Sequence, residues 1–161
     1  MNNNLTHPTL ALLVAGFTQL AAAEGSVGIV PQIMVGTAGM EIGLAVEVRS
    51  PRWQELNLRP ELFLNNDERV GGGLSVLWAF SDWFNFPDRH DFAIGPRVVH
   101  HNTEDEGLDA SALGIWSIAL GDVVDRRHAI EVLAAVGVLQ DREEDDADPS
   151  LSVGAAYAYR F

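Results

Sequence analysis

The chain has 161 residues, with 47% hydrophobic and 20% charged residues, which suits one folded domain and fits neither a disordered nor a collagen-like chain. The formal net charge of -13 at pH 7 excludes nucleic acid as an expected partner, because phosphate contacts need clustered Lys and Arg. No cysteine is present, so disulfides and thiolate metal sites are excluded as well.

The first element is an apolar stretch over residues 8–23 that ends in three alanines just before Glu24. An apolar run that closes on small residues predicts a secretory signal peptide over residues 1–23, with cleavage after Ala23. The stretch is too short to span a bilayer as a helix, and the alternative to a signal peptide is a buried N-terminal helix. The predicted mature domain is residues 24–161.

The mature region repeats a two-residue period. A transmembrane strand needs about 9 to 11 residues in which apolar side chains alternate with small or polar ones. The segments that fit this period predict eight strands, over residues 27–35, 40–48, 56–65, 73–80, 92–101, 108–120, 128–140 and 150–161. Segment 108–120 fits least well, because Leu113 and Ile115 fall on its inward face, and segment 128–140 also suits a helix by propensity.

Turn and breaker residues modify this pattern. The link from Gly36 to Gly39 suits a tight hairpin. Pro31, Pro60 and Pro96 lie inside predicted strands, which counts against central strand positions because proline lacks the backbone N–H of a ladder donor. We expect bulges or strand ends to absorb them.

The last five residues alternate large aromatic side chains with small or charged ones and stop on Phe161. Here the sequence resembles bacterial outer-membrane β-barrel proteins, whose final strand typically ends in Phe with aromatic residues two and four positions earlier. The resemblance implies that Tyr157, Tyr159 and Phe161 are recognised by the barrel-assembly machinery. The whole mature pattern is similar to small barrels of the OmpA and OmpX type. This implies an all-β, antiparallel, up-and-down transmembrane barrel of eight strands in the lipid of a Gram-negative outer membrane.

Charged residues occupy the inward face of the predicted strands. They are Glu41, Glu47, Arg59, Glu61, Arg97, Glu131 and Arg160. An eight-stranded barrel is just wide enough for side chains to fill, and buried charges persist only when paired. We therefore expect an interior ion-pair network in a packed polar lumen. A narrow porin-like pore or a proton path is the alternative.

The acidic segment 141–148 is a weak candidate for a hard cation such as Ca²⁺, with Asp141, Glu143 and Asp145 as ligands. It lacks the EF-hand pattern, since Asp146 stands where the glycine belongs, and a solvated acidic loop is the favoured interpretation. Divalent cations at this loop are a possible partner. No cofactor is expected.

Some small outer-membrane barrels are lipid A deacylases with a His and a Ser two residues apart on a lipid-facing strand. The run His100-His101-Asn102-Thr103 fails this match, because Asn102 stands where the serine is wanted. Ser111 with Glu104 or Asp109 completes a triad only in principle. The sequence therefore predicts a protein that is not an enzyme.

The favoured hypothesis is a non-enzymatic outer-membrane barrel of the cell envelope, with a structural, adhesive or narrow-pore role. One alternative is a soluble periplasmic barrel or sandwich of lipocalin kind that binds a small apolar ligand. A third is an outer-membrane enzyme that modifies lipid. The first two differ in which face of the sheet is polar.

Overall fold

The computed structural model describes residues 26–49, 55–66, 70–80, 87–101, 107–121, 127–140 and 147–161. The predicted signal peptide, residues 1–23, lies outside these ranges. The described residues form eight strands and no helix. The strands are β1 (Val27–Gly36), β2 (Gly39–Arg49), β3 (Leu56–Asn65), β4 (Val70–Ala79), β5 (His90–His100), β6 (Leu108–Leu120), β7 (His128–Gln140) and β8 (Ala147–Arg160).

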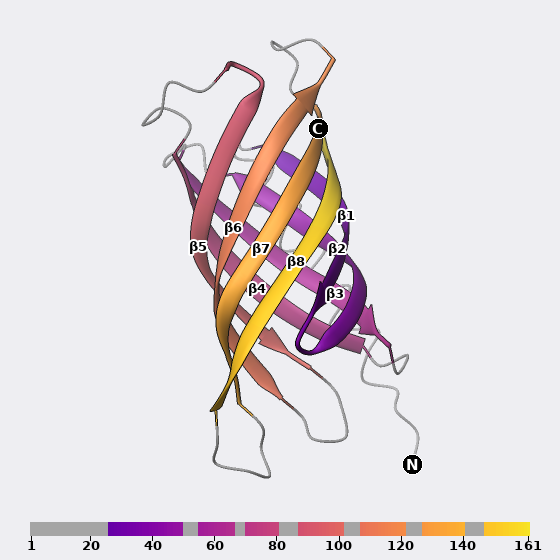
Figure 1. The fold of residues 1–161 in the computed structure, drawn as a ribbon. Coiled ribbons are helices and arrows are strands. Elements are labelled where there is room, and N and C mark those ends of the chain that lie inside the picture. Colours follow the sequence, from indigo (N-terminus) through magenta and orange to yellow (C-terminus); the bar gives the residue numbers. More distant parts are fainter. Residues whose placement is uncertain are drawn as a thin grey trace.

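Each strand pairs antiparallel with the next along the chain, and β8 pairs with β1, so the sheet closes into a barrel (Figure 1). The chain is therefore the all-β, up-and-down, eight-stranded barrel that its pattern predicted. The sandwich among the alternatives is wrong, because all eight strands belong to one closed sheet. Among the described residues, no helix is long and apolar enough to cross a membrane.

Several strand ends differ from the predicted ones. Strand β4 begins at Val70 rather than at residue 73, because the glycines that follow continue the pairing with β3 from Leu64↔Val70 onward. Strand β8 begins at Ala147, so Asp148 belongs to the strand and not to the acidic loop. The long partner β7 causes this, since the β7–β8 register continues to Gln140↔Ala147. Strand ends thus depend on the partner strand as well as on the local period.

The two segments with ambiguous patterns are both strands, β6 and β7, and they pair along their whole length. The inward face of β6 carries Leu113 and Ile115, which pack in the lumen with Met34 and Leu133. The lumen therefore holds a mixture of apolar and charged side chains, where the sequence predicted a polar one. Large inward aliphatic residues explain why the period of segment 108–120 is weak.

The three interior prolines are accommodated by gaps in the hydrogen-bond ladder. The pairing skips two residues in β1 against β8, in β3 against β2, and in β5 against β4. Pro31, Pro60 and Pro96 each lie in one of these gaps, where no N–H donor is needed. The third gap also contains Gly95, where an added Cβ would overlap the carbonyl oxygen of Val76.

Candidate functional site: the ion-paired barrel interior

The alternation along the strands places all seven predicted interior charges on the lumen side of the wall. Six of them are buried, and the side chain of Arg160 is 13% exposed near the end of β8. Apolar side chains such as Ile42, Val132 and Val153 lie on the outer face of the same strands. The polar face of this sheet is therefore the inner one.

The middle of the lumen is filled by side chains from four strands. Arg59 of β3 lies 2.6 Å from Glu131 of β7 through its Nη1 atom, and its Nη2 donates to Gln32 Oε1 at 3.1 Å. The amide of Gln32 in turn donates to Glu61 Oε2. The Nε atom of Arg97 on β5 donates to the other oxygen of Glu61 at 2.6 Å. These contacts join opposite walls of the barrel.

The contacts continue toward the end of the barrel where β8 stops, here called the C-terminal end. Arg160 lies 3.2 Å from Glu131 and 3.1 Å from Glu47. Glu47 also accepts a hydrogen bond of 2.6 Å from Arg49 Nε, and Arg49 lies 3.7 Å from Asp91. Three carboxylates are thus matched by Arg59, Arg49 and Arg160 in this half of the lumen.

The contacts also reach the opposite end. Arg97 Nη2 lies 3.5 Å from Glu41, and Nδ1 of His101 lies 3.1 Å from the other oxygen of that carboxylate. His101 packs against the ring of Phe63 with 5.5 Å between ring centroids. Beside them Ser150 donates to Asp109 at 2.5 Å. We call the connected series from His101 to Asp91 the interior ladder.

Eleven residues form the interior ladder. They are His101, Glu41, Arg97, Glu61, Gln32, Arg59, Glu131, Arg160, Glu47, Arg49 and Asp91. The cavities beside it have volumes of about 20 Å³ toward the C-terminal end and about 10 Å³ toward the opposite end. Such cavities have room for a water molecule and not for a larger solute. Within the described residues the lumen is therefore filled.

Sequence reasoning missed three charged residues of this interior. Asp91 and Asp109 face inward on β5 and β6, and Arg49 contacts Glu47 and Asp91. Gln32, on the inward face, links two charged pairs. Extending the two-residue period by one step beyond the predicted start of β5 would have found Asp91. The partners that cross the lumen carry no local signal, since Arg59 and Glu131 are 72 positions apart.

Among the described residues, the candidates for the alternative catalytic triad do not come together. His100 is exposed on the outer face of β5, whereas His101 is buried in the lumen beside Glu41. Ser111 and Asp109 are buried on the inward face of β6, and Asp109 is bound by Ser150. Asn102, Thr103 and Glu104 lie outside the described residues.

The weak metal candidates Asp141, Glu143 and Asp145 also lie outside the described residues. In the part of the chain that the structure describes, no group of three or more His, Cys, Asp or Glu side chains could hold a metal ion. Tyr157, Tyr159 and Phe161 line one face at the end of β8, and Tyr159 meets Phe161 edge to face at 5.0 Å.

The sequence matches no protein-family model and no curated protein. A comparison with solved structures finds similarity to the crystal structure of Neisserial surface protein A, with a TM-score of 0.41 and 9% sequence identity. The match covers 84% of this chain and 94% of that chain. The barrel architecture follows from the strand register of this chain.

Proposed function

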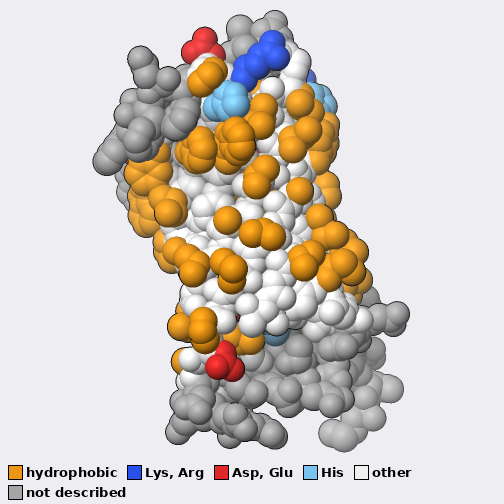
Figure 2. All heavy atoms as spheres, in the orientation of Figure 1, with side chains coloured by type: hydrophobic (Ala, Val, Ile, Leu, Met, Phe, Trp, Pro, Cys, Tyr) orange, Lys and Arg blue, Asp and Glu red, His pale blue; other side chains and the backbone are white. Residues whose placement is uncertain are grey.

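We propose that this chain is an integral outer-membrane β-barrel of a Gram-negative cell envelope, with a closed, ion-paired lumen. The observation that carries the proposal is the distribution of polarity across the wall. Twenty-four large hydrophobic side chains are exposed in the described residues, while the charged residues of the strand centres face the lumen. Figure 2 shows this apolar surface on one face of the barrel, with charged and His side chains near the ends.

Burial energetics favour lipid over water as the surroundings of this surface. Soluble monomers rarely expose contiguous apolar patches larger than a few hundred Å². Exposed aliphatic residues on every strand form a band that exceeds that limit. In lipid, hydrocarbon chains cover this band, so its exposure to water no longer costs free energy. The strands have 10 to 14 residues, which is sufficient for tilted strands to cross an apolar layer about 25 Å tall.

The rival functions fit the described residues less well. A lipocalin-like carrier needs an apolar cavity, whereas this lumen contains the interior ladder and cavities of about 20 Å³ or less. A lipid-modifying enzyme needs its His and nucleophile on the same side of the wall, and His100 and Ser111 face opposite sides. A filled lumen favours a structural or adhesive role over a narrow pore. We therefore propose a non-enzymatic role for this barrel.

The partners in this proposal follow from the two ends of the chain and the loops. Signal peptide 1–23 would direct export, and Tyr157, Tyr159 and Phe161 would be bound by the assembly machinery. Divalent cations would associate with the acidic segment 141–148. Outer-membrane lipid would surround the aliphatic band.

Migration in SDS gels with and without boiling tests the proposal. We expect the mature chain in the outer-membrane fraction, with an unboiled band that migrates differently from the boiled one. Planar-bilayer recordings should then show no steady conductance. Discrete channel openings would instead support the narrow pore and contradict the structural role. A single unchanged band in the soluble periplasmic fraction would contradict the membrane assignment.

A further inference from the structure

The end of the lumen opposite the C-terminal end contains more buried carboxylates than guanidinium groups. Glu41, Glu61 and Asp109 are buried there. Among the described residues, Arg97 supplies the guanidinium that contacts Glu41 and Glu61. In the C-terminal half, by contrast, the carboxylates are matched by arginines. Buried charges persist only when they are compensated, so this end needs a further source of positive charge.

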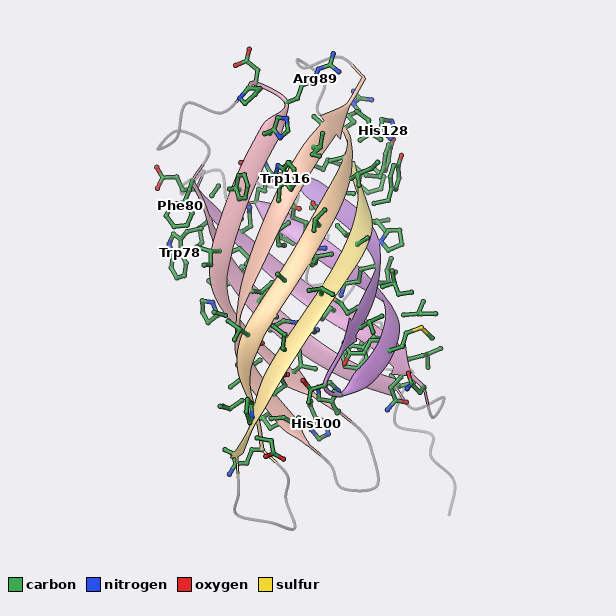
Figure 3. All side chains as sticks on the ribbon, viewed as in Figure 1. Trp78, Phe80, Arg89, His100, Trp116 and His128 are labelled. Atoms are coloured by element: carbon green, nitrogen blue, oxygen red, sulfur yellow. The ribbon has the colours of Figure 1, made fainter. Side chains whose placement is uncertain are left out.

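His101 is placed to supply that charge. It follows His100, which Figure 3 labels at this end of the barrel, and it faces the lumen, where it is 3% exposed. Nδ1 of His101 lies 3.1 Å from Glu41 Oε1, and an ionised carboxylate only accepts, so Nδ1 carries a proton. Nε2 is buried and has no hydrogen-bond partner in the part of the chain that the structure describes. A neutral ring would therefore leave a bare lone pair on Nε2 inside the barrel.

Asp109 presents an unpartnered acceptor in the same region. Its Oδ2 atom accepts a hydrogen bond of 2.5 Å from Ser150, but its Oδ1 atom is buried and has no partner among the described residues. Asp109 and His101 both line the cavity of about 10 Å³ at this end. Buried acceptors are normally satisfied by a donor. A donor is therefore missing beside this cavity, and a proton on Nε2 would supply one.

We propose that His101 binds a second proton in the folded barrel near neutral pH and forms an imidazolium between Glu41 and the cavity that Asp109 lines. The proton comes from the solvent, adds to the lone pair of Nε2 and forms the second N–H bond of the ring. Among side chains, imidazole changes its charge closest to neutral pH, so it takes up this proton more readily than a carboxylate would. The site lies inside the wall and does not depend on whether lipid or water covers the outer face.

The groups that face His101 from the surrounding strands favour the imidazolium. In the described residues, β1, β4 and β7 contribute no charged side chain at this level of the lumen. The charged groups on the other strands are Glu41 of β2, Glu61 of β3, Arg97 of β5, Asp109 of β6 and the exposed Asp148 of β8. Arg97 opposes a second positive charge, but its Nε atom is bound by Glu61 at 2.6 Å. Carboxylates outnumber the guanidinium, so the surroundings of the ring are negative.

The proton on His101 couples this end of the barrel to pH. The backbone amide of His101 donates to the carbonyl oxygen of Gly107 at 2.9 Å, which ties the end of β5 to the start of β6. Loss of the proton would leave Glu41 and Asp109 uncompensated at this point. A group that binds a proton more tightly in the folded chain than in the unfolded chain stabilises the fold at low pH, and this contribution is lost as the pH rises. We therefore expect the barrel to become less stable as the pH rises above neutral.

The ¹⁵N NMR spectrum of the full mature barrel, labelled at histidine, tests the site directly. We expect both ring nitrogens of His101 to carry a proton at about pH 7, with the signals assigned by their absence from His101→Gln. Glu41→Gln removes the charge beside Nδ1 and should convert most of His101 to the neutral ring. Asp148→Asn removes an exposed carboxylate at the same end and should leave the imidazolium in place. A wild-type spectrum with one unprotonated ring nitrogen on His101 at about pH 7 would overturn the inference.

Urea unfolding of the same proteins gives an independent measurement. The urea midpoint of the wild type should fall between about pH 6 and about pH 9, and His101→Gln should remove this fall. His100→Gln replaces the neighbouring exposed histidine and should keep it. An equal fall in the wild type and in His101→Gln would contradict the coupling. If His101→Gln does not fold, the ring signals of the wild type are assigned through the backbone amide of His101, and their protonation alone decides.

Discussion

Replacing Arg59 by Met removes the central cation of the interior ladder while keeping a similar side-chain length. Arg59 is 1% exposed and lies 2.6 Å from Glu131, which is also 1% exposed. Removing one partner of a buried ion pair lowers the free energy of unfolding by about 3–5 kcal/mol, because the other charge is left unpaired in the low-dielectric interior. Glu131 keeps Ser117 at 3.0 Å and Arg160 at 3.2 Å, so we expect the lower end of that range.

A loss of about 3 kcal/mol corresponds to about a 100-fold change in the unfolding equilibrium constant. Urea unfolding of the barrel in lipid vesicles, followed by tryptophan fluorescence, measures it. The double variant Arg59→Met with Glu131→Gln should be more stable than the sum of the single changes predicts, by about 1–3 kcal/mol. As a control, Glu55→Gln at an exposed position should change stability by no more than about 0.5 kcal/mol. Additive effects, or an Arg59→Met variant as stable as the wild type, would refute the role assigned to the ladder.

Three further changes test other parts of the wall. Gly95→Ala should reduce the folded fraction in the gel-shift assay, because the added Cβ meets the carbonyl of Val76, whereas Gly114→Ala, with its nearest atom at 3.8 Å, should fold normally. Val132→Arg should lower the free energy of unfolding, measured in urea, by about 2–4 kcal/mol, because it places a charge on the outer face at mid-strand. Gln140→Arg at the strand end should lower it by only about 0–1 kcal/mol. Phe161→Ala should lower the amount assembled in cells, by immunoblot of outer membranes, and leave refolding in vesicles unchanged; equal amounts in cells would contradict an assembly role.

Much of this fold was predictable from the sequence, because a two-residue period needs no knowledge of partner strands. The two-residue period predicted the eight strands, their order and the faces on which Glu41, Arg97 and Glu131 lie. The strand ends were less predictable, because β8 is extended by pairing with β7 and not by its own residues. The gaps beside the three prolines depend likewise on the register of neighbouring strands.

The contacts of the candidate site could be predicted only in part. The sequence indicated that inward charges must pair, but the pairing of Arg59 with Glu131 depends on the closure of the barrel and the stagger of its strands. The aromatic partners of His90 and His128, Trp116 and Tyr157, lie on the following strand and depend on the register of the strands.

Spin labels along β7 test the central claim that the apolar face of the wall meets lipid and the charged face meets the lumen. The chain has no cysteine, so single cysteines at residues 129–136 can be labelled without a background. In reconstituted vesicles, collision with oxygen should be high at even positions such as 132 and 136 and low at odd positions such as 133 and 135. Uniform accessibility along the strand, or the inverse alternation, would contradict the account.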